Sequence, residues 1–535
     1  MEHKQNSHNR LIRNRMTRRE ILKYGLCGTA ASLAPSVWLT GCIKKHSVSD
    51  RPNILWFLWD TVRADHMSLY AYEKPTTPFL DDWAQQGLVF NNCTSVSNST
   101  IPTHVSMFTG LMPSEHRRDN TQNYLGDAFT TLPELLHKHG YQTYMYSANP
   151  HINQSRNFSQ GFDAAECPWE KKYKRKALKI FQQKLNPLDR STDELETINR
   201  FRIIGKKWPV PAQAFTASGE LAQQATENWL ETCTRKRPFF VFLNYMEAHQ
   251  PYIPPDLYRK RLMSPVQVAK SYGVCRSHLA KWSYTFGLKE YTKEEIELTK
   301  LTYDATLADL DNQLKEFLAS LKVRGYMDNT MIIITSDHGE HLGEKHMLDH
   351  LFSVYEPLIR VPLIIYYPKL FSPGVDDRPV MNFDLFPTIL DSAGIKMPQD
   401  LRTKAVSLLQ PKDERIQVAE RPARKAHQYR IVQKDYPNFD PTPWNRRLRA
   451  VYQGKYKFIW TSDGQHELYD IKADPGETKN LAGAKPQLAA KLKTIHDNYV
   501  KTLVKPKTAT QENIPMTIQQ RRRLESLGYT GPKQN

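Results

Sequence analysis

The 535-residue sequence has few cysteines and no long apolar run. None of its six cysteines forms a Cys-x-x-Cys pair, so the spacing indicates neither a structural zinc cluster nor an obvious disulfide framework. The weakly apolar stretch at residues 26–39 is too short and too rich in small residues to span a bilayer. No internal repeat is present. Hydrophobic residues make up 40% and charged residues 24%, which is ordinary for a globular protein.

Acidic residues are outnumbered, with 56 Asp and Glu against 74 Lys and Arg and a formal net charge of +18. Such a surface attracts anionic partners, but charge alone does not choose among nucleic acid, acidic glycans and membrane lipid. A nucleic-acid partner is not expected, because no recognition motif accompanies the basic residues. Two basic stretches, 166–215 and 255–297, are interpreted as insertions over the sheet. The first is either a solvated helix face or a rim that gathers a polyanionic substrate.

The N-terminus has the form of an export signal. Residues 17–23, Thr-Arg-Arg-Glu-Ile-Leu-Lys, are typical of a twin-arginine signal, and residues 39–42, Leu-Thr-Gly-Cys, resemble the lipidation box of bacterial lipoproteins. The alternative is a basic tail with a chance arginine pair. We predict a signal over 1–42, a tether over 43–52, and a periplasmic or cell-surface protein anchored by lipid at Cys42. That lipid is the only membrane contact expected, and Met16 is an alternative start.

Short apolar runs alternate with helical patterns through the body of the chain. The runs are residues 53–60, 141–148, 239–246, 330–335 and 362–367, and helical periodicity covers 78–87 and 303–321. Near-continuous apolar strands between helices predict an α/β fold, with a mostly parallel mixed sheet sandwiched by helices over residues 53–400. Residues 401–535 are predicted to form a smaller α+β subdomain of short antiparallel strands, with a hairpin around Gly454, plus one helix.

Chemically active residues stand where the predicted strands end. Asp60 closes the first run, Asp337 and His338 follow the run at 330–335, and His249 lies just beyond the run at 239–246. Ligands of open parallel sheets bind at the carboxyl ends of the strands, and an unpaired carboxylate there is costly. Two carboxylates and one imidazole are a plausible ligand set for a single divalent ion such as zinc or manganese.

Thr100 precedes Pro102 at a predicted helix N-terminus, in the stretch Asn-Ser-Thr-Ile-Pro-Thr-His of residues 98–104. By itself this pattern is most simply an ordinary helix cap. The strand-end carboxylates favour another interpretation, in which the helix terminus attracts an anion and a metal-bound Thr100 hydroxyl becomes a nucleophile.

The ordered motifs resemble the sulfatase family, within the alkaline phosphatase superfamily. The resemblance covers roughly residues 52–530, and its motifs stand at 53–55, 60–65, 77–81, 100–104, 109–113, 249–252, 336–344, 355–363, 468–481 and 524–529. It implies that Asp60, Asp337 and His338 bind the metal together with Thr100, the nucleophile. It also implies that the substrate or leaving group meets His249 and His350; His341 and His346 are expected at the surface.

The chain departs from the family pattern at the nucleophile. Typical members read Cys or Ser, any residue, Pro, any residue, Arg, whereas this chain has Thr100 and His104 at the two ends. His104 is therefore placed beside Thr100 among the candidate catalytic residues, and formylglycine is not expected. Thr61 replaces a second aspartate, and His338 stands where calcium enzymes tend to have Asn. These changes favour zinc or manganese over calcium, which is still possible.

The preferred function is a metal-dependent hydrolase of sulfate esters whose substrate is an anionic ester such as a sulfated polysaccharide. One alternative is a phosphodiesterase, phosphonate monoester hydrolase or phosphoryl transferase of the same superfamily, although the extra Asp/His set of a two-zinc phosphodiesterase is not evident. The other is a binder of sulfated glycans that performs no catalysis.

Overall fold

The computed structural model describes residues 50–119, 122–184, 217–274, 277–410, 413–424 and 426–504. All of them belong to one compact unit, His46–Asn535. The predicted signal with Cys42, most of the tether, part of the first insertion and the motif at 524–529 lie outside the described residues. Within the described part of the chain, no helix combines the length and apolarity that a membrane crossing requires.

An eight-stranded sheet forms the centre, in the order β11-β2-β10-β7-β1-β6-β4-β5. Strand β1 pairs in parallel with both β6 and β7, and β4 pairs in parallel with β6 and β5, whereas β10 runs antiparallel to β7 and β2. The predicted mostly parallel mixed sheet is therefore confirmed. Its strands are β1 (Asn53–Trp59), β2 (Leu88–Phe90), β4 (Gln142–Ser147), β5 (Ala164–Glu166), β6 (Phe239–Tyr245), β7 (Thr330–Thr335), β10 (Leu363–Tyr366) and β11 (Gly374–Asp376).

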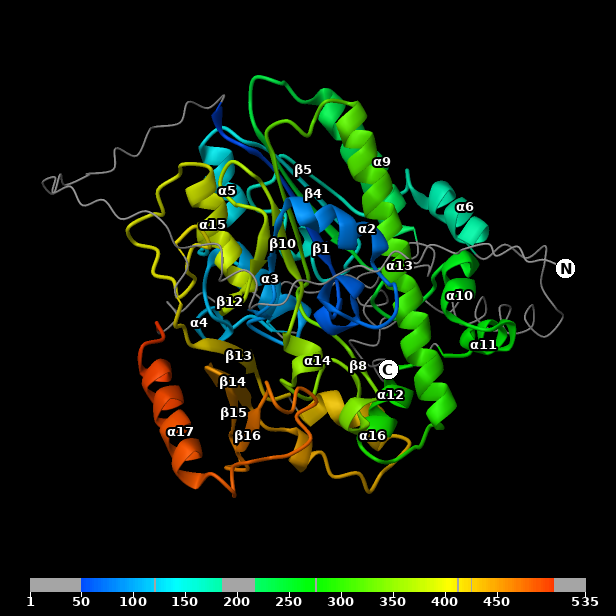
Figure 1. Cartoon of the computed structure of the whole chain (residues 1–535), viewed down its shortest axis with the longest axis vertical. Helices are drawn as coiled ribbons and strands as arrows, with labels where there is room; N and C mark the ends of the chain where they lie inside the picture. Colours follow the sequence, from blue (N-terminus) through cyan, green and yellow to red (C-terminus); the bar gives the residue numbers. More distant parts are fainter. Residues whose placement is uncertain are drawn as a thin grey trace, which may run out of the picture. The chain divides into compact units, whose positions relative to one another are not determined.

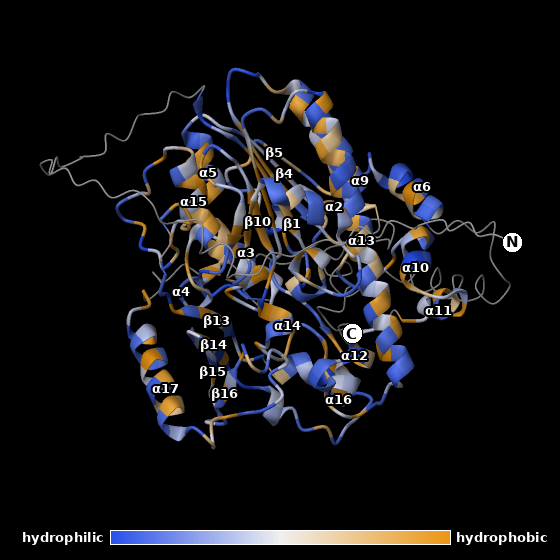
Figure 2. Cartoon of the chain, in the orientation of Figure 1, coloured by the Kyte–Doolittle hydropathy of each residue, from blue (hydrophilic) through white to orange (hydrophobic). Residues whose placement is uncertain are grey.

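Helices cover both faces of this sheet, which explains why its inner strands are apolar along their whole length (Figures 1 and 2). On one face, Leu55, Phe57 and Trp59 of β1 belong to a core with residues of α2 (Pro78–Trp83), α9 (Ser218–Thr232) and α13 (Lys293–Val323). On the other, Ile54, Trp56 and Leu58 share a core with α3 (Thr100–Thr109), α5 (Leu132–Lys138) and α15 (Leu385–Ser392).

A separate four-stranded antiparallel sheet lies near the C-terminus, as the sequence predicts (Figure 1). Its strands are β13 (Gln417–Arg421), β14 (Leu448–Gln453), β15 (Tyr456–Thr461) and β16 (Glu467–Asp470). Strands β14 and β15 form the hairpin around Gly454, where the backbone has a φ of +58° that glycine adopts without strain. Helix α17 (Pro486–Lys501) packs on this sheet through Leu492. The domain boundary at residue 400 stays a prediction.

The second basic stretch folds as helices that pack beside the long helix α13. Helices α10 (Asp256–Leu262) and α11 (Pro265–Ser271) share a small core with Leu301, Ala305 and Ala308 of α13, and α12 (His278–Thr285) follows. The first stretch contains α6 (Lys174–Lys184). The remaining elements are β3 (Cys93–Thr94), α4 (Pro113–His116), β8 (His341–Leu342), β9 (Leu348–Asp349), α14 (Glu356–Ile359), β12 (Val380–Met381), α16 (Arg430–Gln433) and short 3-10 turns at 64–66, 68–70, 84–86, 154–156, 344–346, 382–384, 426–429 and 442–444.

Candidate active site

The carboxyl ends of β1, β6 and β7 meet at one edge of the sheet, because the three strands are parallel neighbours. Asp60 follows β1 directly and its N–H donates to the carbonyl of Tyr245 at the end of β6 (3.0 Å). Asp337 and His338 follow β7. The strand geometry thus brings together residues that are 277 positions apart in the sequence.

Asp60, Asp337 and His338 form a group that could hold a metal ion. One ligand atom from each lies within 4.8 Å of the others, and all three side chains are fully buried. Asp60 Oδ1 and Asp337 Oδ2 are buried without a hydrogen-bond partner among the residues described. Burial and the charge of Asp337 raise the pKa of Asp60 well above its usual range. Two adjoining buried carboxylates, each with an oxygen that accepts no hydrogen bond, suit a cation, since an unpaired buried charge is costly.

Neighbouring groups orient these ligands. Asn149 donates to Asp60 Oδ2 at 2.7 Å, and the N–H groups of Thr61 (3.2 Å) and His338 (2.9 Å) donate to Asp337 Oδ1. The hydroxyl of Thr61 instead bonds to backbone carbonyls, 2.7 Å from that of Asp60 and 2.9 Å from that of Ala248. Such supporting contacts fix the direction in which each ligand points. Thr61 therefore supports the loop backbone.

The His338 ring points its Nε2 at Thr100. Its Nδ1 lies 2.9 Å from the carbonyl oxygen of Gly339, which only accepts, so this nitrogen carries the proton in the neutral ring. Nε2 then holds a lone pair and lies 3.2 Å from Thr100 Oγ1, whose hydroxyl donates to it. Burial lowers the pKa of His338. The ring is thus held neutral with its lone pair available.

Thr100 is the first residue of α3, and Ser99 occupies the N-cap position. The Thr100 side chain is 2% exposed, and Pro102 lies in the first turn, where it needs no N–H. The positive end of α3 therefore lies beside a hydroxyl that faces the candidate metal ligands. Such a position suits an incoming oxyanion.

His104 lies one turn further along α3, in the core. Its Nδ1–H donates to the Thr100 carbonyl at 2.8 Å, and its ring meets Phe158 and Phe242 edge-on. Burial lowers the pKa of His104 to about 4. His104 Nδ1 also lies 3.8 Å from Asp337 Oδ2, so the ring supports the backbone at Thr100; its catalytic role stays a prediction.

His249 and His350 stand beside His338. The ring centroids of His338 and His350 are 4.4 Å apart, and those of His249 and His350 are 5.5 Å apart. His249 Nδ1–H donates to the Gln250 carbonyl at 2.7 Å. Burial lowers the pKa of His249 to about 3 and that of His350 to about 4. The structure therefore gathers the two predicted substrate-facing histidines at the metal-ligand group.

Sequence reasoning missed a second buried group next to the first, formed by Glu340, Asp349 and His350. His350 Nδ1 lies 3.2 Å from Asp349 Oδ1 and 3.5 Å from Glu340 Oε1. Asp349 Oδ2 already faces the Lys281 ammonium at 3.1 Å and the His278 ring at 2.9 Å. The Lys281 ammonium already neutralises this carboxylate. The group therefore resembles an ion-pair cluster that orients His350, and it resembles a second metal centre less.

The expectation for His341 is wrong, while that for His346 is confirmed. His341 is 2% exposed, and its Nε2 lies 2.7 Å from the hydroxyl of Ser353. His341 lies in β8, which pairs with β9 opposite Asp349. The side chain of His346 is 41% exposed.

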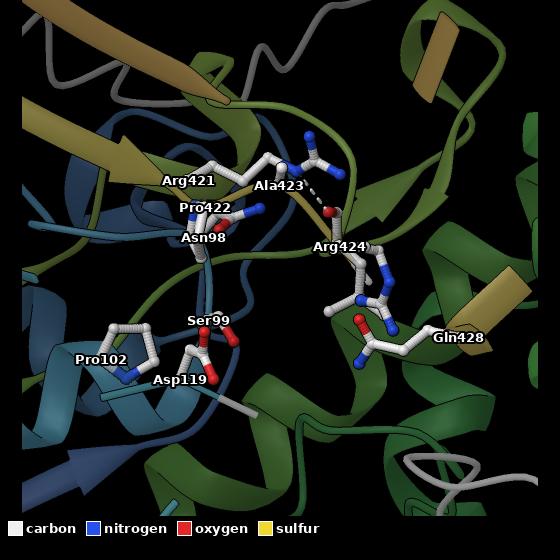
Figure 3. Close-up of a pocket in the computed structure, with 10 residues that line it drawn as sticks. Asn98, Ser99, Pro102, Asp119, Arg421, Pro422, Ala423, Arg424 and Gln428 are labelled. Carbon is white, nitrogen blue, oxygen red and sulfur yellow. Dashed lines mark hydrogen bonds between the residues drawn. The ribbon is translucent and has the colours of Figure 1, made fainter. Parts of the chain in front are cut away.

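A pocket opens at the start of α3. Ser99 and Pro102, on either side of Thr100, line one wall, and the segment after β13 lines the other. Figure 3 shows Arg424 and Gln428 together on that second wall, facing Ser99 and Asp119. The full lining is Asn98, Ser99, Pro102, Asp119, Leu351, Arg421, Pro422, Ala423, Arg424 and Gln428.

Comparison with known proteins points to one family. A family model described as sulfatase matches residues 52–395, which is more than half of the chain. A second model, described as N-sulphoglucosamine sulphohydrolase, C-terminal, matches residues 343–505. These two ranges include the central sheet, the candidate site and the C-terminal sheet.

Individual relatives are distant but cover most of the chain. An N-acetylglucosamine-6-O-sulfatase of Bacteroides thetaiotaomicron is 27% identical over 502 residues, 83% of this chain and 85% of the relative. Arylsulfatase K of Mus musculus is 24% identical over 472 residues, 84% of this chain and 79% of the relative.

Solved structures share the fold at lower identity. One, in complex with its substrate D-glucosamine-2-N,6-O-disulfate, has a TM-score of 0.62 at 22% identity and covers 84% of this chain and 97% of its own. The phosphonate monoester hydrolase of Agrobacterium radiobacter has a TM-score of 0.61 at 21% identity, with 84% and 95% covered. The chain therefore belongs to the sulfatase family of hydrolases.

Proposed function

We propose that the protein is a metal-dependent hydrolase that cleaves the sulfate ester of a sulfated saccharide, with Thr100 as its nucleophile. The observation that carries the proposal is the position of Thr100 Oγ1, 3.2 Å from His338 Nε2, beside two buried carboxylates with vacant oxygens. A hydroxyl placed at a helix N-terminus and next to such a ligand group suits attack on a tetrahedral oxyanion.

Asp60, Asp337 and His338 would hold one divalent ion, with the Thr100 hydroxyl alongside. Two carboxylates and an imidazole favour zinc or manganese over calcium, which prefers more oxygen ligands. When bound, such an ion supplies positive charge that promotes ionisation of a hydroxyl and stabilises negative charge on the reacting ester.

The reaction then divides among the residues of this chain. Thr100 Oγ1 attacks sulfur, and the bond between sulfur and the ester oxygen breaks with its electron pair passing to that oxygen. The hydroxyl proton of Thr100 passes to a neutral imidazole, and His249 and His350, whose pKa values burial lowers, are the candidates for carrying it to the departing oxygen. Water then hydrolyses the Thr100 sulfate ester and frees the hydroxyl. Formylglycine is not part of this proposal, because position 100 is a threonine.

The relatives suggest the substrate class. One is named for a 6-O-sulfate of N-acetylglucosamine, and one solved structure holds a disulfated glucosamine. A sulfated amino sugar is therefore the first substrate to test. Phosphodiester or phosphonate monoester hydrolysis is the second candidate, because a phosphonate monoester hydrolase shares the fold and a threonine nucleophile can also attack phosphorus.

We also propose export by the twin-arginine route, with lipid attachment at Cys42. The support is the order of the arginine pair, the apolar stretch and the cysteine in residues 17–42. Cys42→Ser should release the protein from the membrane fraction if the anchor exists, whereas unchanged fractionation of that variant would exclude it.

Thr100→Ala tests the proposed chemistry. The variant and the wild type are assayed in parallel on glucosamine 6-sulfate, an aryl sulfate, an aryl phosphodiester and a phosphonate monoester. We expect wild-type turnover to be fastest on a sulfate ester and the variant to lose at least about a thousandfold, because the reacting atom itself is removed.

Thr100→Ser serves as the matched control, since it keeps a hydroxyl. Mass spectrometry of the peptide that contains Thr100, after quenching with each ester, should reveal a sulfated adduct in the wild type. Near-normal rates in Thr100→Ala would overturn the nucleophile, and a phosphorylated adduct formed faster than a sulfated one would favour the second candidate.

A further inference from the structure

The pocket at the start of α3 contains a cation without a counter-ion. Arg424 forms no hydrogen bond and no ion pair with any residue that the structure describes, and its Nε is buried without a partner. Burial lowers the pKa of Arg424, and Tyr429, Asp349 and Asp119 oppose that shift only in part. The Arg424 side chain is half-buried, and a guanidinium whose Nε has neither water nor an acceptor is costly, so this position suits an anionic ligand.

The neighbouring Arg421 shows what a structural arginine looks like in this fold. Its Nε donates to the Leu351 carbonyl at 2.8 Å, and its Nη2 donates to the Trp444 carbonyl at 3.1 Å. Its Nη1 donates to the carbonyl of Arg446. Every nitrogen of Arg421 is therefore used to hold the pocket wall, whereas Arg424 has donors to spare.

Aromatic rings hold the Arg424 guanidinium in place. Its central carbon lies 4.8 Å from the centroid of the Trp282 ring and 5.7 Å from that of Phe352. Packing against aromatic rings restrains the side chain while its N–H groups remain able to donate to a ligand. Those N–H groups match the paired oxygens of a sulfate or a carboxylate.

The pocket is also next to the reacting residues. Ser99 and Pro102 flank Thr100, Leu351 follows His350, and Asn98 donates to the His350 carbonyl at 2.8 Å. A sugar whose ester reaches Thr100 therefore extends its other substituents toward this pocket. Asp119, on the wall opposite Arg424, repels anions and accepts hydroxyl groups, so it limits the direction in which a charged sugar can enter.

We propose that this pocket is a subsite for a second anionic group of the substrate, a sulfate or a carboxylate on the sugar, and that Arg424 recognises it. The inference rests on the proposed function for the placement of the first ester at Thr100, and it adds a preference for saccharides with two negative groups over saccharides with one.

Arg424→Gln tests the subsite by comparing substrates. Values of kcat/KM are measured for glucosamine 6-sulfate, glucosamine 2-N,6-O-disulfate and a 6-sulfated disaccharide that contains a uronate. A hydrogen-bonded charge contributes about 1.5–3 kcal/mol, so the variant should lose roughly 10- to 100-fold more on the doubly charged sugars than on the singly charged one, mostly in KM. The disulfate and the uronate distinguish sulfate from carboxylate recognition.

Two further variants make the result specific. Arg424→Lys keeps the charge and should recover part of the preference, while Arg430→Gln removes an exposed arginine outside the pocket and should keep the wild-type ratio between substrates. Equal losses on singly and doubly charged sugars in Arg424→Gln would overturn the subsite, and so would no loss on either.

Calorimetry on Thr100→Ala separates this inference from the proposed function. The disulfate should bind that variant at least about tenfold more weakly once Arg424→Gln is added. If the wild type hydrolyses no sulfate ester, the proposed function is wrong. The difference in disulfate binding would still show whether Arg424 recognises an anionic group. Equal binding of the disulfate with and without the Arg424→Gln change would overturn the subsite, and so would the absence of any binding of the disulfate.

Discussion

At the scale of single residues, two carboxylates with vacant oxygens dominate the candidate site. Asp60 and Asp337 are both fully buried, and each already accepts the hydrogen bonds that its neighbours offer on one oxygen. The remaining oxygens, Asp60 Oδ1 and Asp337 Oδ2, have no donor within the described part of the chain. Their mutual repulsion destabilises the metal-free protein, so metal binding should stabilise the fold.

Asp337→Asn should separate the two effects. We expect the variant to lose most of its bound zinc or manganese and most of its activity, since a charged ligand becomes neutral. The metal-free variant should nevertheless unfold at a temperature equal to or above that of the metal-free wild type, because the repulsion with Asp60 is removed. Metal analysis and thermal unfolding with and without a chelator measure both quantities.

The exposed Asp328 provides the matched control, because Asp328→Asn changes the same charge away from the site. A wild type whose unfolding temperature did not rise when zinc or manganese was added would contradict the metal assignment. So would an Asp337→Asn variant that retained its full metal content.

The sequence could single out Asp60, Asp337, His338 and Thr100 as candidates because each stands at the end of a strand or the start of a helix, where ligands of such sheets bind. Lys281, Glu340 and Arg424 could not be found in this way. Lys281 is 1% exposed only because α12 packs against β9, and a lysine in a basic stretch gives no local sign of burial. The position of Arg424 depends on a loop after β13 that meets α3 across the pocket.

At the scale of elements, α13 shows what periodicity could and could not define. The predicted helix at 303–321 is confirmed, but α13 begins ten residues earlier, at Lys293, after a capping box formed by Thr292 and Glu295. In its additional turns Leu301 shares a core with α10 and α11, whose packing could not be known from the helix's own sequence. Strands β1, β6 and β7 were predictable because both of their faces are covered and their sequences are continuously apolar.

Helix α13 also caps α2 through one buried carboxylate. Asp311 accepts from the N–H groups of Phe79 (2.8 Å) and Leu80 (3.0 Å) at the start of α2 and is 2% exposed. Burial raises the pKa of Asp311 to about 7; Asp81 raises it further and Lys315 opposes the shift. A carboxyl group with a raised folded-state pKa contributes stability that is complete below about pH 4 and is lost as the pH rises through 7.

Asp311→Asn should therefore flatten the pH dependence of stability. We expect the unfolding temperature of the wild type to fall between pH 5 and pH 8 by an amount equivalent to a few kcal/mol, on the order of what linkage gives for such a shift. The variant should be less stable than the wild type at pH 5 and should lose less over the same interval. Glu316→Gln, an exposed change on the same helix, should keep the wild-type slope; an unaltered slope in Asp311→Asn would contradict the assignment.

At the scale of the whole molecule, the C-terminal sheet holds the site's loops in place. Glu420 of β13 donates its N–H to the Val96 carbonyl at 2.8 Å, and Ser97, shortly before Thr100, donates its hydroxyl to the Glu420 carbonyl at 2.7 Å. The order of strands and helices predicted two sheets, but it could not predict that an edge strand of the second would extend toward the loop before Thr100. The small sheet therefore helps to position the loop that leads to Thr100.

Lys457 places a buried charge between the C-terminal sheet and α14. Its side chain is fully buried in β15, and its ammonium lies 2.9 Å from Glu356 at the start of α14 and 2.7 Å from Glu477. These carboxylates raise the pKa of Lys457 against the effect of burial, and Glu477 Oε2 also accepts from the Glu356 N–H at 2.7 Å. Removing the ammonium leaves two carboxylates facing each other without a cation.

Lys457→Met should accordingly destabilise the protein by about 3–5 kcal/mol, the usual cost of breaking a buried ion pair from one side. Adding Glu477→Gln should recover part of that loss, because one uncompensated charge disappears. Lys455→Met removes an exposed lysine that pairs with Asp470 and should change stability little.

Thermal unfolding and limited proteolysis measure the differences in stability. Turnover that depends on Thr100 should fall in parallel, since the same sheet holds the loop before α3. Equal stability of Lys457→Met and Lys455→Met would show that the C-terminal sheet is held by its apolar contacts alone.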